Sequence, residues 1–215
     1  MPRIKGRNTQ ATREAVLAAA EWAFAEYGFE NATFAIIAQR AGVTAATLPY
    51  HFADKKGLWD ATIESFYKGL FAFATTVRPN EPLEAVLGSF YDWAMHHRSG
   101  IRVIIRHVIE TGSLDREVRE VGMMRAFDLV AAQASQRYGV DRDAALDTTI
   151  AVTHLMTRFI TNSPEDNRRA FHVDNDAEVR ARVVSILSRV AHCLLGIGPM
   201  SSALAGASAP RETLV

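Results

Sequence analysis

The chain has 215 residues, of which 48% are hydrophobic and 22% charged, a balance typical of globular proteins and not of disordered ones. Its 24 basic residues balance 24 acidic ones, so nucleic-acid binding would depend on a local cluster of charge. The single cysteine, Cys193, excludes an internal disulfide framework and a cysteine-rich metal site. The sequence shows neither the apolar core of a signal peptide nor an uncharged apolar run of about 18 residues, so we expect a cytoplasmic protein without a membrane span.

Helical periodicity dominates from the first residues onward. Apolar residues recur every three or four positions between Val16 and Tyr27, which predicts a helix that begins near Asn8 or Thr9 and ends at Gly28. A short helix over 33–41, a turn at 42 and a second short helix over 45–50 are expected next. Together these segments predict a three-helix unit of the helix-turn-helix kind.

The rest of the chain is also predicted to be helical. Asp54 is placed to begin a helix that runs to about residue 75, and the stretch 78–82 breaks the pattern. Further helices are expected from 82 to 98, between the breaks at 99–100 and 112–113, over 115–138, over 141–162 and from 176 onward, with a polar connection over 163–175. No alternating strand pattern is found, so the expected fold class is all-α. We predict a DNA-binding domain over 1–55, a helical ligand-binding and dimerisation domain over 56–197, and a disordered tail over 198–215.

The segment 33–58 carries the functional information. Gly42 suits a tight turn between two short helices, and Leu48 and Phe52 can pack the second helix onto the first helix of the chain. The exposed face of the helix over 45–50 then carries small and polar side chains, which permit close approach to base edges and phosphates. The candidate DNA-binding residues are Thr33, Thr44, Ala45, Ala46, Thr47, Tyr50, His51 and Lys55.

This segment resembles the signature of the TetR family of bacterial transcriptional regulators. The likeness runs from Arg13 to Leu58, with Gly28 closing the first helix, Thr33 as a cap, Ala41-Gly42-Val43 at the turn, and Tyr50-His51-Phe52 followed by Lys55 and Leu58. The resemblance implies an operator-binding homodimer whose last two long helices form the subunit interface, with a small-molecule pocket among the other helices.

One residue departs from the family pattern. Family members usually carry an aromatic residue, commonly Tyr, where this chain has Pro49. Pro49 lacks a hydroxyl for a phosphate and a backbone N–H, and it disfavours helical geometry at Leu48. One expectation is that the recognition helix ends early or pivots, which shifts phosphate contacts to Tyr50, His51 and Lys55. The alternative is that Pro49 only closes a helix that was ending at this point.

The first thirteen residues are basic, with Arg3, Lys5, Arg7 and Arg13 and no acidic residue. Such an arm can enter a minor groove while Thr44 or Thr47 and thymine methyl contacts read the major groove. The alternative is a disordered, solvated leader.

Two surfaces are predicted for the C-terminal part. Apolar stripes on the helices over 141–162 and from 176 onward are compatible with a dimer interface and equally with an internal core. Candidate ligand-binding residues, each of which can also be ordinary core, are Phe66, Leu70, Phe90, Trp93, His97, Met123 and Phe127.

The histidines of this part raise the question of a metal site, and its arginines that of an anionic ligand. His96 and His97 point about 100° apart on a helix and cannot chelate from one face, so no metal and no cofactor is expected. Arg102 and Arg106 either bind an anionic ligand or form solvated pairs, for example with Glu110.

The sequence thus predicts a ligand-responsive repressor that leaves a palindromic operator when a small molecule binds. An activator of the same fold is an open alternative. A helical enzyme is disfavoured, since no Ser/His/Asp arrangement, glycine-rich phosphate loop or Glu-x-x-His pair is found.

Overall fold

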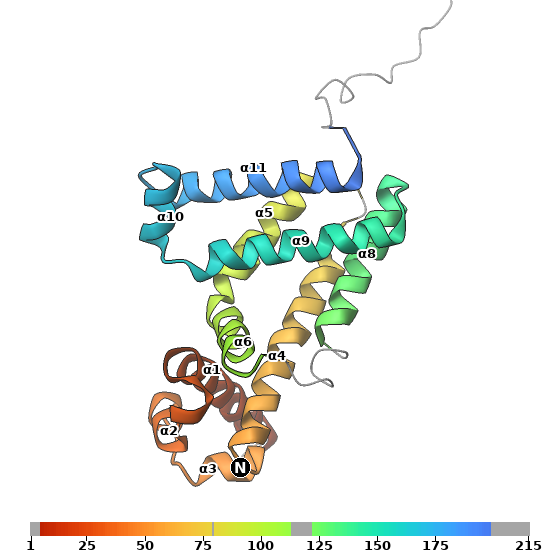
Figure 1. Ribbon diagram of the computed structural model, residues 1–215. Coiled ribbons are helices and arrows are strands. Elements are labelled where there is room, and N and C mark those ends of the chain that lie inside the picture. Colours follow the sequence, from red (N-terminus) through yellow and green to blue (C-terminus); the bar gives the residue numbers. More distant parts are fainter. Residues whose placement is uncertain (1–4, 79, 113–121, 199–215) are drawn as a thin grey trace, which may run out of the picture.

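The protein is helical throughout the part described by the computed structural model, which comprises residues 5–78, 80–112 and 122–198. These residues form ten helices and no strand, so the expected all-α class is confirmed. Figure 1 shows a small group of helices at the bottom, which we call the head (residues 5–52), below a larger bundle. None of the described helices is long and apolar enough to cross a membrane.

The head consists of α1 (Lys5–Asn31), α2 (Phe34–Ala41) and α3 (Thr47–Phe52). Its interior is built from the predicted apolar stripe of α1, where Val16 and Phe24 are almost wholly buried. Ile37 from α2 and Leu48 from α3 are fully buried against it. The hydrophobic periodicity therefore fixes how the two short helices lie on α1.

Helix α1 starts earlier than expected, at Lys5 and not at Asn8 or Thr9. Lys5 and Arg7 are therefore helical and not part of an extended arm, whereas Arg3 lies outside the described residues. Gly28 interrupts α1 as predicted, with φ 77° and ψ 170°, and one more turn follows it to Asn31.

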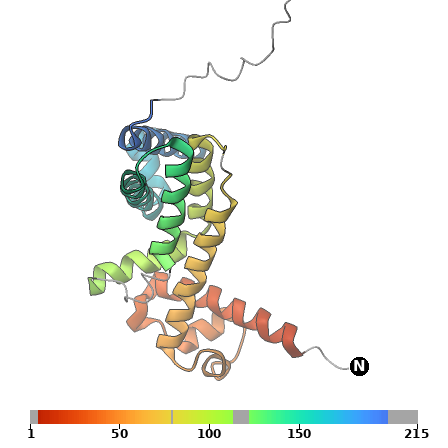
Figure 2. The ribbon, with the colours of Figure 1, turned by 90° about the vertical axis from the view of Figure 1, so that its right-hand side faces the viewer.

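A single long helix, α4 (Lys55–Thr76), leads from the head into the bundle. Helix α8 (Met124–Tyr138) lies beside the upper half of α4, as the turned view in Figure 2 shows. The predicted helix over 115–138 is thus confirmed from Met124, while 113–121 lie outside the described residues.

The other bundle helices are α5 (Leu83–His96), α6 (Arg98–Thr111), α9 (Arg142–Thr161), α10 (Pro164–Phe171) and α11 (Asp176–Leu195). Helices α9 and α11 pack on each other at the top of Figure 1, with α5 behind them. The caps predicted at Asp54 and Asp141 are present, since their carboxylates accept hydrogen bonds from Gly57 N–H and from Asp143 and Ala144 N–H. The predicted tail beyond residue 198 lies outside the described residues.

Two further expectations about the bundle are wrong. The break expected at Ser99-Gly100 falls instead at His97. Gly100 lies inside α6, where a Cβ would come within 2.5 Å of the Phe66 ring, so glycine at this position allows the two helices to approach closely. The polar connection over 163–175 contains α10, whose Ser163 hydroxyl accepts the Asp166 N–H at 3.0 Å. The Ser-Pro-Glu-Asp sequence at this point is a helix-start signal that the apolar pattern hid.

Helix α6 is bonded to a different helix at each end. At its start, the Arg98 guanidinium donates to the backbone carbonyls of Ile160 (2.8 Å) and Asn162 (2.7 Å), which close the C-terminus of α9. At its other end, Arg106 reaches the C-terminal part of α1. A cation at a helix C-terminus satisfies otherwise unpaired carbonyls and meets the negative end of the helix dipole. Helix α6 therefore links α9 to the head directly.

Candidate nucleic-acid interface and ligand pocket

The turn between α2 and α3 has the geometry that the sequence predicts. The Thr33 hydroxyl accepts the Ile36 N–H at 3.3 Å and caps α2. Gly42 closes α2 in the left-handed conformation, with φ 69° and ψ 29°, which a residue with a side chain would adopt only under strain. This turn sets the angle at which α3 leaves α2.

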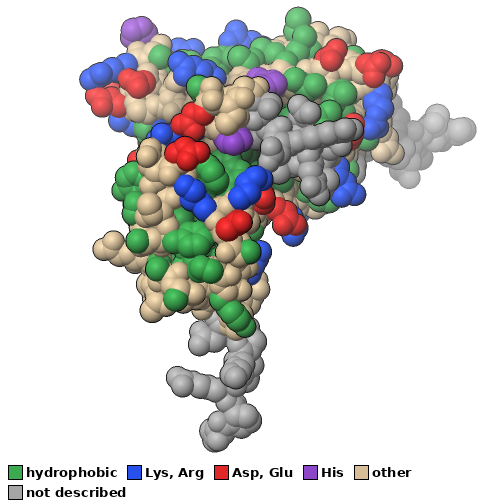
Figure 3. Space-filling model, turned by 60° about the horizontal axis from the view of Figure 1, so that its bottom comes forward, with side chains coloured by type: hydrophobic (Ala, Val, Ile, Leu, Met, Phe, Trp, Pro, Cys, Tyr) green, Lys and Arg blue, Asp and Glu red, His purple; other side chains and the backbone are tan. Residues whose placement is uncertain are grey.

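The outer surface of the turn and of α3 is small, polar and exposed. Thr44, Ala45 and Ala46 are exposed before the helix, and the hydroxyls of Thr44 and Thr47 lie 3.0 Å apart. Tyr50 is 83% exposed although it is aromatic. In Figure 3, where the bottom of the molecule comes forward, hydrophobic side chains and uncharged surface make up much of the head, and Lys and Arg side chains are few among them. An exposed Tyr beside small residues offers a hydroxyl and a flat apolar face to a partner.

Pro49 lies in the first turn of α3 and does not end it. The helix runs from Thr47 to Phe52, so Pro49 is its third residue, where its missing N–H would have no partner within the helix. The expectations that Pro49 shortens or closes the recognition helix are therefore both wrong. Proline instead gives α3 a rigid beginning.

The connection from α3 to α4 is a tight turn centred on Ala53. Its φ of 59° and ψ of −64°, with the Asp54 N–H donating to the Phe52 carbonyl at 2.7 Å, make a γ-turn with positive φ, a rare and strained conformation. Gly57 completes the junction, because a Cβ there would lie 2.3 Å from the Phe52 carbonyl oxygen. The close approach of α4 to the end of α3 thus depends on glycine at position 57.

Three basic side chains in the head and at the start of α4 rest on aromatic rings. The Lys55 ammonium donates to the Glu30 carbonyl at 2.9 Å and lies 4.8 Å from the Phe29 ring centroid. The Arg40 guanidinium lies 3.9 Å from the centroid of Trp22, and Arg13 lies over Phe52. Lys55 is among the predicted DNA contacts, whereas Arg40 was missed, because its place beside the turn follows only from the packing of α2 on α1.

Arg106 joins the bundle to the head. Its guanidinium donates to the carbonyls of Glu26 (3.1 Å), Ala25 and Tyr27 (both 3.4 Å) and to the Glu110 carboxylate (2.7 Å). Gly28 makes room for it, since a Cβ at that position would come within 2.9 Å of the guanidinium. The predicted pairing of Arg106 with Glu110 is present, and the contacts with α1 are additional.

Arg102 lies one turn earlier on α6 and pairs with Glu26 at 3.1 Å. Each arginine of the pair thus has a carboxylate partner, so neither charge needs an anionic ligand. This geometry favours the salt-bridge alternative over an anionic ligand at the two arginines.

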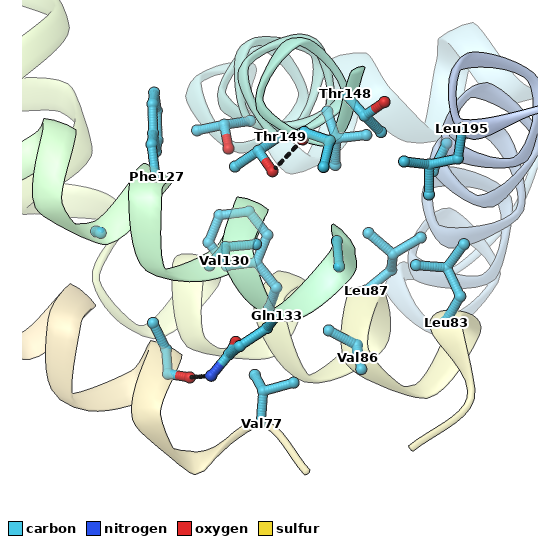
Figure 4. Close-up of a pocket in the computed structure, with 18 of the residues that line it drawn as sticks. Val77, Leu83, Val86, Leu87, Phe127, Val130, Gln133, Thr148, Thr149 and Leu195 are labelled. Atoms are coloured by element: carbon cyan, nitrogen blue, oxygen red, sulfur yellow. Dashed lines mark hydrogen bonds between the residues drawn. The ribbon is translucent and has the colours of Figure 1, made fainter. Parts of the chain in front are cut away.

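A cavity of about 130 Å³ lies between α4, α5, α8, α9 and α11. Figure 4 shows its walls, with Val130 and Gln133 from α8, Leu87 from α5 and Thr149 from α9 facing the space. Of the predicted ligand residues, Leu70, Phe90 and Phe127 line it.

Four predicted pocket residues lie elsewhere, namely Phe66, Trp93, His97 and Met123. Phe66 packs against Gly100, Trp93 stacks on His97 with ring centroids 4.3 Å apart, and Met123 packs on the main core. Phe66 faces α6 at Gly100 and therefore does not face the cavity. The wall residues on α9 and α11 were missed, since a helical stripe shows that a face is buried but not which element covers it.

Buried titratable groups gather where α1 meets α4 and α6, away from this cavity. Burial raises the pKa of Glu21, while His97 and a hydrogen bond from the Gly100 amide favour its charged form. Burial raises the pKa of Tyr67 to about 12. Within the described ranges, no three His, Cys, Asp or Glu side chains gather closely enough to hold a metal ion.

Residues 16–62 match the family model for bacterial regulatory proteins of the tetR family. The chain is 30% identical to the transcriptional regulator BetI of Cronobacter sakazakii over 121 residues, 50% of this chain and 58% of that protein. It is 31% identical over 100 residues to the transcriptional activator FasR of Mycolicibacterium smegmatis, covering 44% and 46%, and 29% identical over 106 residues to the transcriptional repressor KstR2 of Mycobacterium tuberculosis, covering 47% and 52%. The matched part thus spans about half the length of these curated relatives.

Solved structures share the whole fold. A transcriptional regulator of the TerR/AcrR family from Aquifex aeolicus superposes with a TM-score of 0.64 at 13% identity over 83% of this chain and 99% of that one. A TetR-like transcriptional regulator from Rhodococcus gives 0.61 at 18% identity over 91% and 99%. The fold and the head define an all-helical protein of the helix-turn-helix class. Its residues 16–62 match the TetR family model, and the remaining helices share their arrangement with structures of TetR-like regulators.

Replacing Gly57 by Ala tests the junction between α3 and α4. The added Cβ would collide with a backbone oxygen, so we expect the free energy of unfolding to fall by about 1–3 kcal/mol in urea denaturation. Gly69→Ala is the matched control in the same helix, because its Cβ would meet only Trp93 at 3.9 Å. That variant should gain up to about 1 kcal/mol from helix propensity. Equal effects of the two substitutions would contradict the geometry of the junction.

Proposed function

We propose that the protein is a homodimeric regulator of transcription that binds a palindromic operator through α3. The observation that carries this proposal is the exposed, small and polar surface of the turn and α3 in a head that matches the TetR family. A two-fold dimer would place two recognition helices about one DNA turn, roughly 34–36 Å, apart. Thr33, Thr44, Thr47, Tyr50, His51 and Lys55 supply phosphate and base contacts, and Ala45 and Ala46 allow close approach and thymine methyl contacts.

Operator binding is proposed to be relieved by a small molecule in the bundle cavity. A fatty acid degradation regulator, FadR of Bacillus halodurans, has a similar fold, with a TM-score of 0.57 at 15% identity over 85% of this chain and 94% of that one. Release requires the ligand to bind the DNA-incompetent conformation more tightly than the competent one. Relatives include both an activator and a repressor, and we propose repression because ligand-induced release needs only one change, in the spacing of the two heads.

The proposed route from cavity to head runs along two helices. Helix α4 lines the cavity with Leu70, Phe73 and Val77 near its C-terminus and joins α3 at its N-terminus. Helix α6 fixes the other side of the head through Arg106. A ligand that displaces the upper part of α4 while α6 stays bonded to α9 would rotate the head.

The proposed dimer interface is the outer face of α9 and α11. Each helix exposes a large apolar side chain, Leu155 (38% exposed) on α9 and Leu194 (46% exposed) on α11. Leu187 is fully buried within the chain and so belongs to the core of the protomer. No enzymatic activity is proposed, since the matched family is one of regulatory proteins.

Lys55 tests the phosphate contacts. Lys55→Met keeps the apolar stem over Phe29 and removes the charge, so affinity for any duplex should fall and the slope of log K against log salt should decrease by about 1. The control Lys68→Met removes an exposed lysine paired with Glu64 further along α4. An unchanged slope for Lys55→Met, measured by fluorescence anisotropy, would count against a phosphate contact.

The dimer face is tested by Leu155→Glu with Leu194→Glu. Burying carboxylates at an interface costs about 3 kcal/mol or more, so dimer dissociation should rise by at least about a hundredfold. Ile109→Glu, at a side chain that is 78% exposed on α6, should leave the dimer intact. Sedimentation equilibrium distinguishes the outcomes, and an unaltered double variant would show that the interface lies elsewhere.

Arg106→Met tests the link between α6 and α1. The variant removes the guanidinium that donates to the Ala25, Glu26 and Tyr27 carbonyls, so amide hydrogen exchange in residues 22–31 should accelerate and the free energy of unfolding should fall by about 1–3 kcal/mol. Arg102→Met removes only the exposed pair with Glu26 and should change stability by less than about 1 kcal/mol. Identical exchange in both variants would show that Arg106 does not hold the head.

A further inference from the structure

The cavity in the bundle has walls that select among ligands, and this selectivity matters for regulation only if the proposed ligand response holds. Figure 4 shows apolar side chains in the walls of the cavity, among them Leu83, Leu87, Val130 and Leu195. It has a volume of about 130 Å³. Apolar cavities of this kind stay free of water, because water would find too few hydrogen-bond partners in them.

Three polar side chains in the walls direct a donor at backbone carbonyls. The hydroxyls of Thr148 and Thr149 donate to the carbonyls of Ala144 (2.7 Å) and Ala145 (2.8 Å), one turn earlier on α9. The Gln133 amide donates to the Ala74 carbonyl on α4 at 3.5 Å. None of these donors is turned toward a ligand, and Figure 4 shows the bonds of Thr149 and Gln133 directed at the backbone.

No charged side chain supplies an anchor for a ligand in place of these donors. Among the described residues that line the cavity there is no Lys, Arg, His, Asp or Glu. The remaining polar ones, Thr153 and Tyr138, are uncharged at neutral pH, and burial raises the pKa of Tyr138. A carboxylate placed here would be a buried charge without a partner, which is strongly unfavourable.

The volume restricts the size of the ligand. An engineered cavity of about 150 Å³ with leucine, isoleucine and phenylalanine walls binds benzene in another protein. The present cavity is of the same order and has the same kind of wall. It therefore accommodates about one six-membered ring with short substituents and not an extended chain.

We propose that the bundle cavity binds a small uncharged hydrocarbon-like molecule, on the scale of a single ring, and excludes carboxylic acids of the same shape. Recognition then comes from burial of apolar surface, with no charge-paired anchor. The ligand class is set by Val130, Leu87 and their neighbours and by the absence of any donor directed at the cavity from Thr148, Thr149 or Gln133.

The test compares probes of matched shape on the full chain. p-Xylene should raise the melting temperature increasingly with its concentration, with the logarithmic dependence expected of a ligand bound only to the folded state. 4-Methylbenzoate, which replaces one methyl group by a carboxylate, and decanoate, which is an extended acid, should give no shift at neutral pH. A shift with either acid equal to that with p-xylene would overturn the proposal, and so would the absence of a shift with p-xylene at its solubility limit.

Two variants locate the binding. Val130→Phe fills the cavity and should weaken p-xylene binding by about tenfold or more, whereas the control Ile109→Phe on exposed α6 should leave it unchanged. Should Val130→Phe not fold, Val86→Ala enlarges the same cavity and should raise the affinity for naphthalene relative to p-xylene. Unaltered p-xylene binding in a folded Val130→Phe protein, or an unaltered naphthalene preference in Val86→Ala, would place the ligand elsewhere and refute the assignment.

The experiment tests the proposed ligand class and the proposed ligand-induced release by separate readouts, so either proposal can be contradicted without the other. Binding of p-xylene is read from melting temperature, and operator release is read from DNA affinity in the same samples. Binding without any change in DNA affinity would contradict ligand-induced release and leave the ligand class standing. Release by an acid but not by p-xylene would contradict the ligand class and leave the regulator intact.

Discussion

One guanidinium group at the end of α6 adds a polar link between the bundle and the head to the hydrophobic core that they share. Arg106 donates to three carbonyls at the C-terminal end of the straight part of α1, and Gly28 provides the space that its side chain occupies. Since the donor is a charged guanidinium, the interaction is charge-assisted and costly to remove. The orientation of α2 and α3, which pack on α1, follows from it.

This arrangement gives the molecule two connections between bundle and head. One is covalent, through the strained turn at Ala53 and the glycine contact at Gly57 into α4. The other is non-covalent, through α6, which Arg98 fixes to α9 at its opposite end. Because the head is held at two points, a displacement of α4 relative to α6 would change the orientation of α3, which is the movement that the proposed ligand response requires.

Much of the head could be predicted from the sequence because its signals are local. The Thr33 cap, Gly42 in the left-handed region, the Asp54 cap and the apolar stripe of α1 each act within a few residues, and all are confirmed. Pro49 was misjudged, because the start of α3 depends on where the turn ends and not on the proline alone. The cavity was predicted only in part. Leu70, Phe90 and Phe127 line it, but the packing of α6 against Phe66 is a contact between helices that no periodicity reveals.

Selection of bound duplexes from a random pool with the purified protein, at moderate salt, tests the proposed regulator most directly. A two-fold dimer presents α3 twice, about one helical turn apart, so we predict enrichment of a palindrome whose half-sites have that spacing. Enrichment of single, unpaired half-sites, or of no sequence at all by a folded dimer, would contradict it.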